Sequence, residues 1–359
     1  MTSIAPPVAN GRSFDLFRSL AAALRSLCGR PLVLAFAAVP LAVVLALLGV
    51  IVYVSFLDSL GDGLHGALTL RHYRALTEDP LVVSALWNTA GFTLVAVLTA
   101  MLIGGSIAWL VERTDLPAKR LVYVFMTIGL LVPTFFMAMG WVFFLHPRIG
   151  MFNVWMMKVF NLDQAPLSIA NVVGMGWVEG LGLASLAFMM LSPIFKALNP
   201  SLEEAATVHG LGRWATLRKV VLPLTWPALL ACAIYISVIA FAAFEVPAII
   251  GMGNRIFTFA TVVYVKIAPD QGVPNFGLVG AISVVLIILS TLLSWWYFRV
   301  IRLSDRFGVI QGRGYQPKLI ALGSKTWLCW AILSLYILLS KLMPLALMVW
   351  ASLLAYFQS

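Results

Sequence analysis

The chain of 359 residues is 62% hydrophobic and only 11% charged, whereas about a quarter of the residues of a soluble globular domain are charged. A net charge of +10 is compatible with a nucleic-acid-binding protein. However, the basic residues lie between long apolar segments and not on one face, so a membrane protein explains them better. We therefore expect a lipid bilayer around this chain and no nucleic-acid partner.

Seven apolar segments are long enough to cross a bilayer, which takes about 20 apolar residues each. Residues 1–30 form a basic tail before the first of them, and that first segment is too long to be the core of a signal peptide. The sequence thus predicts an all-α polytopic membrane protein of about seven transmembrane helices. The predicted spans are 31–57 (with Pro40 as a tolerated kink), 85–111, 121–145, 174–198, 227–250, 276–300 and 327–355.

The distribution of Lys and Arg predicts the orientation of the spans. The tail, the loop after the second span, the stretch after the fourth and the stretch after the sixth hold 17 of them, and the opposite loops hold 6. Cytoplasmic loops carry the excess of positive charge. We expect a cytoplasmic N-terminus and a C-terminus of this chain on the outer, periplasmic side.

A polar stretch at 199–225 separates the fourth and fifth spans. Asn199 or Ser201 can cap a short helix, and Ser201 and Glu204 have the spacing of a capping box. Gly210 can end that helix in a left-handed conformation, and a second, basic helix follows from about Arg213 until Pro223 ends it. On these grounds alone the stretch could also be a solvated connection.

The spacing within this stretch resembles a known motif. Glu204-Ala205-Ala206, then Gly210, then Val220-x-Leu222-Pro223 is similar to the cytoplasmic Glu-Ala-Ala loop of binding-protein-dependent ABC importer permeases. In that family the loop is a coupling helix that inserts into a groove of a separate ATPase subunit. The resemblance implies a type I ABC importer permease helix bundle. It assigns ATPase docking to Ser201, Glu203, Glu204, Ala205, Ala206, Gly210, Arg218, Leu222 and Pro223.

The resemblance also implies a function and partners. The chain would be a permease in the bacterial inner membrane, taking substrate from a periplasmic binding protein and moving it by alternating access. It would not be an enzyme, and it would bind no cofactor itself. No GxxxxGK[ST] phosphate loop is present, so ATP and Mg would be bound by cytoplasmic ATPase subunits. A membrane-embedded enzyme or a scaffold is the alternative class, but the spans hold no HExxH or GxSxG motif and no paired aspartates.

A second resemblance concerns the substrate. Residues 244–251, which include Glu245 and Pro247, are similar to the Phe-Glu-Val-Pro segment of ferric-iron-type permeases. A carboxylate deep in a span is costly and usually faces a cavity or a partner. Glu245 and Pro247 could therefore lie on the translocation path, or the carboxylate could lie at the outer interface beside freed backbone. The resemblance favours ferric iron, then polyamine, then sulfate or thiamine. The scattered histidines have no metal-ligand spacing.

The chain has one predicted span more than the six of the family's pattern. The resemblance covers about 31–303, a six-helix unit, and is followed by a basic linker at 304–326 and a seventh span at 327–359. Met343-Pro344-Leu345-Ala346 resembles Val39-Pro40-Leu41-Ala42 of the first span. The chain is therefore similar to the N-terminal half of a fused two-unit permease, in which the seventh span begins the second half. The other possibility is a homodimer. We expect the seventh span to have nothing to pack against here, and Lys341 to have no counter-ion within it.

Overall fold

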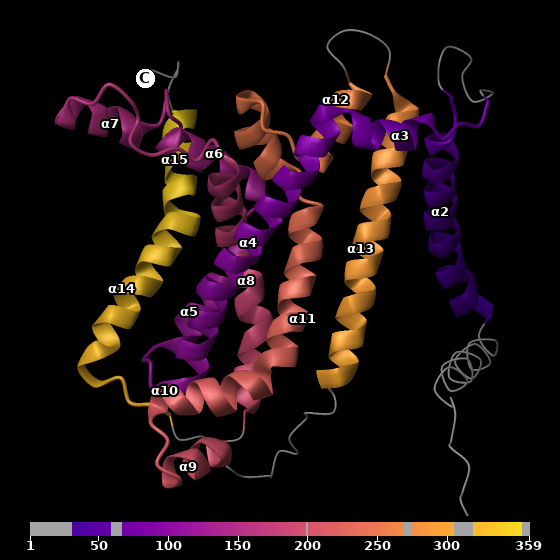
Figure 1. Ribbon diagram of the computed structural model, residues 1–359. Helices are drawn as coiled ribbons and strands as arrows, with labels where there is room; N and C mark the ends of the chain where they lie inside the picture. Colours follow the sequence, from indigo (N-terminus) through magenta and orange to yellow (C-terminus); the bar gives the residue numbers. More distant parts are fainter. Residues whose placement is uncertain (1–30, 59–66, 199, 269–273, 305–318, 354–359) are drawn as a thin grey trace, which may run out of the picture.

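The computed structural model describes residues 31–58, 67–198, 200–268, 274–304 and 319–353. The predicted tail (1–30), most of the linker (305–318) and the predicted cap Asn199 lie outside the described residues. Within the described part, helices follow one another, and β structure is confined to two isolated bridges, Leu57–Leu68 and Thr114–Ile320. The prediction of an all-α protein is confirmed (Figure 1).

The helices form a bundle whose long members run between two ends (Figure 1). In chain order they are α2 (Pro31–Ser55), α3 (Arg71–Glu78), α4 (Pro80–Arg113), α5 (Lys119–Leu131), α6 (Thr134–Leu145), α7 (Met151–Phe160), α8 (Val172–Ala197), α9 (Pro200–Val208), α10 (Arg213–Thr216), η2 (Leu217–Val221), α11 (Leu222–Phe241), η3 (Pro247–Gly251), η4 (Met252–Asn254), α12 (Phe259–Ile267), α13 (Phe276–Ser304), η6 (Gly323–Lys325), α14 (Thr326–Ile337), η7 (Leu338–Leu342) and α15 (Met343–Ser352).

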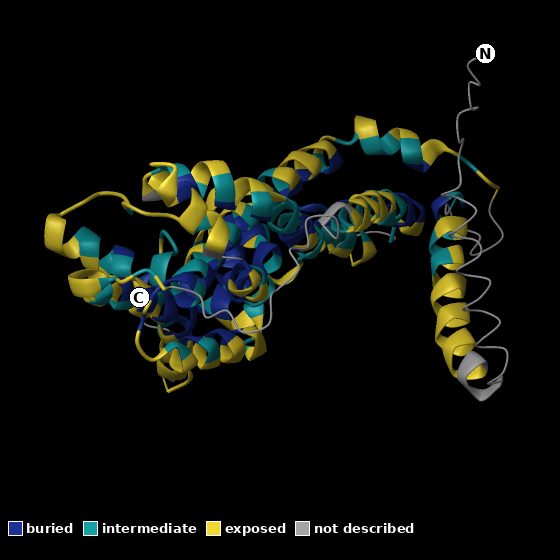
Figure 2. Cartoon of the chain, turned by 90° about the horizontal axis from the view of Figure 1, so that it is seen from below, coloured by how far each residue is buried: buried dark blue, intermediate teal, exposed yellow. Residues whose placement is uncertain are grey.

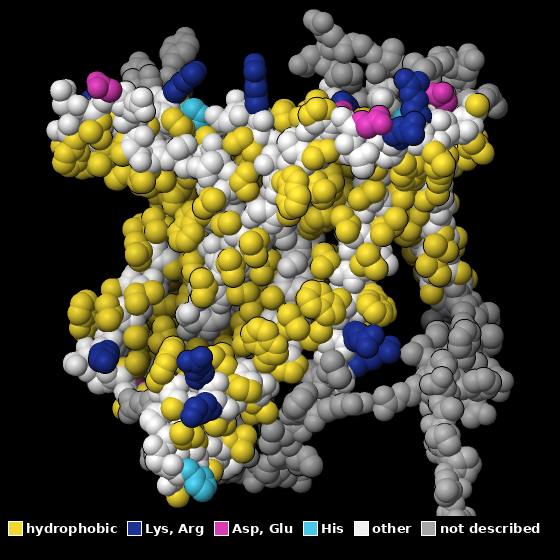
Figure 3. All heavy atoms as spheres, viewed as in Figure 1, with side chains coloured by type: hydrophobic (Ala, Val, Ile, Leu, Met, Phe, Trp, Pro, Cys, Tyr) yellow, Lys and Arg dark blue, Asp and Glu magenta, His cyan; other side chains and the backbone are white. Residues whose placement is uncertain are grey.

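About seven membrane crossings follow from these helices. In the described part, six helices are long and apolar enough to cross a membrane, and two bent helix pairs pass the same test together. One bent pair, α5 with α6, is the predicted third span. The other, η3–η4 with α12, lies near the upper end of the bundle in Figure 1 and begins within the last residues of the predicted fifth span. Figure 3 shows an apolar band between two ends that carry the charged side chains visible in that view.

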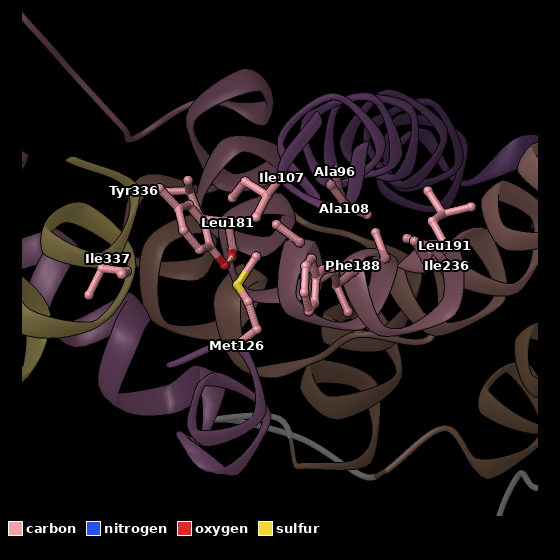
Figure 4. Packing of buried hydrophobic residues seen from close by; sticks show 14 of the residues in the cluster. Ala96, Ile107, Ala108, Met126, Leu181, Phe188, Leu191, Ile236, Tyr336 and Ile337 are labelled. Atoms are coloured by element: carbon pink, nitrogen blue, oxygen red, sulfur yellow. Dashed lines mark hydrogen bonds between the residues drawn. The ribbon is translucent and has the colours of Figure 1, made fainter. Parts of the chain in front are cut away.

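The centre of the bundle is the pair α4 and α8. Small residues let the two backbones touch, as in other membrane helix pairs. A Cβ atom on Gly104 of α4 would lie 2.3 Å from the carbonyl oxygen of Ala184, and one on Gly180 of α8 would lie 2.5 Å from Thr99. Around this pair, buried side chains of α4, α5, α8, α11 and α14 form one cluster, with Phe188 at 0% exposure among them (Figure 4).

The first and last spans have opposite surroundings. No residue of α2 from 35 to 54 is buried, and α2 stands apart from the bundle beside α13 (Figure 2). The last span, by contrast, packs closely on α6, where a Cβ on Gly140 would lie 2.3 Å from the Cα of Pro344. Tyr336 of the last span is buried and donates a hydrogen bond of 3.1 Å to the Leu181 carbonyl of α8. The expectation that the seventh span has nothing to pack against is therefore wrong.

The predicted third span is broken. α5 and α6 meet at an angle of 94° around Val132 and Pro133. A proline disfavours helical backbone in the residue before it and supplies no N–H to the ladder. The predicted fifth span likewise ends early, at Phe241, and the chain resumes helical geometry at Glu245, just before η3, after a break of three residues. Each apolar segment is continuous in sequence, but neither is a continuous helix.

Pro223 does not end a helix. From Trp214 to Phe241 the helix is continuous, with the π-helical turn η2 immediately before Pro223. Such a π-bulge accommodates the proline, which can make no i to i−4 hydrogen bond. The prediction that Pro223 separates the second helix of the loop from the fifth span is wrong, and that helix leads directly into the membrane.

Candidate functional site

The first helix of the polar loop, α9, has two different faces. Glu203 is half-buried and Ala206 is buried, and because these positions are three apart they share the face turned toward the bundle. Ser201, Glu204, Ala205 and Val208 are exposed. α9 begins at Pro200, so Ser201 lies within its first turn and is not the cap.

A glycine turn connects α9 to the next helix. Gly210 has φ +76°, the left-handed conformation that the sequence predicted. Beyond it, Trp214 is 73% exposed, and Arg218, Leu222 and Pro223 are also exposed. Of the nine predicted docking residues, all but Glu203 and Ala206 are thus accessible at the lower end of the bundle (Figure 1).

Glu203 is held by a residue that the sequence reasoning missed. Its carboxylate forms an ion pair with Arg113, the last residue of α4, whose side chain is buried. Little in the sequence indicates this ion pair, because basic residues are common at the C-termini of helices.

A second candidate site lies at the break in the third span. The hydroxyl of Thr134, the first residue of α6, donates a hydrogen bond to the carboxylate of Glu245. Glu245 comes from the interrupted stretch between α11 and η3, so its contact joins the two broken spans. It places a negative charge at the N-terminus of α6, the positive end of the helix dipole. Pro247 is buried and begins η3.

The other end of the same break carries a positive charge. Lys341 is buried, and its ammonium group donates a hydrogen bond of 2.9 Å to the carbonyl oxygen of Gly129 in the last turn of α5. The last carbonyls of a helix have no partner within it and form the negative end of the dipole. Lys341 therefore has an acceptor in the bundle that the sequence did not predict, and this acceptor is a neutral helix end and not a counter-ion.

A further carboxylate approaches Glu245 from α8. Glu179 is 4% exposed and interacts electrostatically with Glu245. Gly182, one turn further along α8, lies next to Thr134, since a Cβ there would be 3.5 Å from the Thr134 methyl group. Glu179 is thus buried in the bundle. The described residues contain no group of three His, Cys, Asp or Glu that could hold a metal ion.

Known proteins resemble this chain over most of its length. A family described as "Binding-protein-dependent transport system inner membrane component" matches residues 102–305, more than half of the chain. The spermidine/putrescine transport system permease protein PotB of Haemophilus influenzae is 26% identical over 257 residues, which cover 70% of this chain and 87% of that protein. The sulfoquinovosyl glycerol transport system permease protein SmoG of Agrobacterium fabrum is 26% identical over 284 residues, 74% of this chain and 89% of that protein.

A solved structure has the same fold. A chain of a bacterial alginate ABC transporter, crystallised with an alginate pentasaccharide-bound periplasmic protein, superposes with a TM-score of 0.57 at 15% sequence identity and covers 83% of this chain and 97% of that one. The predicted type I permease bundle is thereby confirmed at the level of the fold. The chain belongs to the family of inner membrane components of binding-protein-dependent transport systems, that is, to the permease subunits of ABC importers.

Proposed function

We propose that this chain is the membrane-spanning unit of an ATP-driven importer in which a separate ATPase docks on the exposed faces of α9 and α10. The observation that supports this most is the helix–glycine–helix loop at the lower end of the bundle. Its Glu-Ala-Ala helix turns Glu204, Ala205 and Val208 outward and attaches itself to the bundle through Glu203 and Ala206.

The outward face is suited to protein docking. Val208 is 86% exposed, Trp214 is 73% exposed, and both apolar side chains lie at a polar end of the bundle. Exposed aromatic and aliphatic side chains with a charged neighbour such as Glu204 are typical of interface centres. Within the predicted docking set, Glu203 and Ala206 would contribute by fixing α9 in place and not by touching the ATPase.

ATP and its Mg²⁺ would be bound by that ATPase. A periplasmic binding protein would deliver the substrate to the opposite end, at the loops around 58–84, 146–173 and 251–275. A second permease unit, either a fused half or a second copy of this chain, would complete the pathway. With this orientation the N-terminus is cytoplasmic and the end of α15 periplasmic.

The substrate we favour is a cation. Glu245 is exposed on this chain although it belongs to the membrane-embedded part, and Glu179 lies one turn of α8 from Gly182, which contacts the Thr134 that binds Glu245. Lipid does not accommodate a carboxylate, so Glu245 would face the space that a second unit encloses. The polyamine permease among the relatives supports a cation, and ferric iron is the alternative cation. The two relatives reported above are permeases for a polyamine and for a sugar derivative, and neither is an iron permease.

Reversing the charge of Glu204 tests the docking face. We expect Glu204→Lys to insert normally in the membrane, because no span changes, and to lose co-purification with the ATPase. The matched control is Glu78→Lys, an exposed carboxylate of α3 at the opposite end of the bundle, which should keep the ATPase bound. Normal recovery of the ATPase with the Glu204 variant would overturn the docking assignment.

The substrate class is tested on the binding protein encoded beside this chain. Calorimetric titration with putrescine, with ferric iron supplied from a weak chelator, and with sulfate should give binding of one of the cations and none of sulfate. Binding of sulfate alone would contradict the role assigned to Glu245.

A further inference from the structure

Arg113 is an unusual residue in this fold, because a guanidinium at the membrane surface would normally extend into water. Its side chain is 3% exposed and turned inward at the end of α4. One terminal nitrogen, Nη2, pairs with the carboxylate of Glu203 in α9. The other, Nη1, lies 3.4 Å from the carbonyl oxygen of Leu198, directly after α8, and the guanidinium stacks 5.8 Å from the ring centre of Trp109.

These contacts connect elements that are distant in sequence. α9 otherwise packs on α10 and η2, its own neighbours in the loop. The pair of Glu203 with Arg113 connects it to α4, and Leu198 adds the end of α8 to the same point. α4 and α8 are the two helices at the centre of the bundle. A displacement of α9 therefore reaches α4 through this side chain, besides the backbone that joins α9 to α8 and α10 to α11.

The entrance to the last span is attached at the same residue. The backbone N–H of Ile320 donates to the Arg113 carbonyl at 2.9 Å, and the N–H of Asp115 donates to the Ile320 carbonyl at 3.1 Å. The Asp115 carboxylate accepts a further hydrogen bond of 2.8 Å from the Leu322 N–H. A movement of the end of α4 would therefore also displace the start of the last span.

The ion pair of Arg113 and Glu203 also constrains how α9 and α4 can move relative to each other. An exposed ion pair is screened and weak, whereas here the Arg113 side chain is 3% exposed and that of Glu203 is 23% exposed, so breaking the pair would leave a buried guanidinium without its counter-charge. The planar guanidinium fixes direction as well as distance, because its donors lie in one plane. Glu203 and the end of α4 are thus constrained to move together.

We propose that Arg113 is the positioning residue that carries the movement of the coupling helix α9 into α4, α8 and the start of the last span. This inference rests on the proposed function, since the ATPase would drive α9. Arg113 itself is buried and takes no part in docking, which the outward face of α9 and α10 would perform. Loss of Arg113 should therefore leave the ATPase bound but uncouple it from the bundle.

The experiment uses the full chain in lipid nanodiscs with its ATPase and a fluorescent bimane label near the outer end of α4. The label is attached at Trp87→Cys, since Trp87 is 72% exposed, in a chain whose three native cysteines are replaced by alanine. Vanadate with ATP traps the ATP-driven state, and the change in bimane emission reports movement of α4. We compare Arg113→Gln, Arg113→Lys and the charge-exchanged pair Arg113→Glu with Glu203→Arg.

We expect Arg113→Gln to co-purify with the ATPase and hydrolyse ATP while losing the emission change on trapping. Arg113→Lys should retain part of the change, and the charge-exchanged pair should recover part of it, because a partly buried pair of opposite charges is restored. This partial recovery separates a positioning role from a general loss of structure.

An unchanged emission response in Arg113→Gln would overturn the proposal, and so would loss of the ATPase from that variant, which would make Arg113 part of the docking surface. If Arg113→Gln does not fold, the charge-exchanged pair decides: a response supports the proposal and a folded, silent complex overturns it. A parent complex that itself gives no response to ATP would instead contradict the proposed function.

Discussion

Lys341 and Glu245 are charged residues within an apolar bundle, and both are explained by the ends of helices. A break inside a membrane exposes backbone N–H and C=O groups that water would otherwise satisfy, at a cost of several kcal/mol each. Lys341 donates to the Gly129 carbonyl at the end of α5, and Glu245 accepts from Thr134 at the start of α6. Each charge has the sign that the helix end prefers.

Replacing Lys341 should therefore destabilise the bundle. Lys341→Met keeps the length and apolar stem of the side chain but leaves the Gly129 carbonyl without its donor. A buried acceptor without a partner costs about 1–3 kcal/mol, so we expect a lower melting temperature of the purified protein in detergent. Lys325→Met is the matched control, because Lys325 lies in the same span but is exposed. Equal melting temperatures of the two variants would contradict the capping role.

At the scale of the elements, hydropathy located the spans but not their breaks. The stretch 121–145 is apolar throughout, and proline alone does not identify a break. Pro40, Pro193 and Pro227 lie inside continuous helices, whereas Pro133 separates two helices at 94°. The difference lies in tertiary contacts. The helix ends on either side of Pro133 are hydrogen-bonded by residues of η7 and of the interrupted fifth span, which lie about 110 to 210 residues later in the chain. No local pattern contains that information.

The Glu-Ala-Ala loop also has some features that the sequence predicts and one that it does not. Gly210 and the Glu-Ala-Ala helix were predictable, because turn residues and capping act locally. Which of the two adjacent carboxylates faces the bundle was not, since that depends on Arg113, 90 residues earlier in the chain. The docking role of the exposed residues remains a prediction.

The packing of the last span on α6 depends on one glycine. A Cβ on Gly140 would lie 2.3 Å from the Cα of Pro344, a backbone atom that no rotamer change can move. We expect Gly140→Val to separate α15 from α6 and expose Cys329, which is 8% exposed in α14. Faster reaction of Cys329 with a maleimide would show this, and Cys232, buried in α11, serves as an internal reference.

Gly49→Val is the control for that experiment. Gly49 lies in α2, and a Cβ there would meet no atom within 4 Å. The reactivity of Cys329 should then equal that of the parent protein. The same increase in both variants would mean that the added volume, and not the contact with Pro344, loosens the span.

At the scale of the whole molecule, α2 and the last span differ in a way that bears on assembly. α2 contacts α13 and little else, while the last span is integrated with α5, α6 and α8. A seventh span that caps a helix break is part of this bundle's own structure. The interpretation of this span as the start of a second permease half stays a prediction. It is compatible with the packing, because the span could serve both purposes.

The last prediction concerns the orientation of the molecule. The structure gathers the end of α4, the Glu-Ala-Ala loop (α9 and α10) and the start of α14 at one end, and α3, α7 and α12 at the other (Figure 1). This agrees with the sides that the 17-to-6 distribution of Lys and Arg predicts, and positive charge marks the cytoplasmic side.

We expect a phosphatase that is active only in the periplasm to be inactive when fused after Gly212 and active when fused after Gly150. A green fluorescent protein fused at the same two positions should give the reverse pattern, which controls for expression. Phosphatase activity after Gly212 would place the coupling loop outside the cytoplasm, where no ATP is available, and would rule out ATPase docking and the role of Arg113 together.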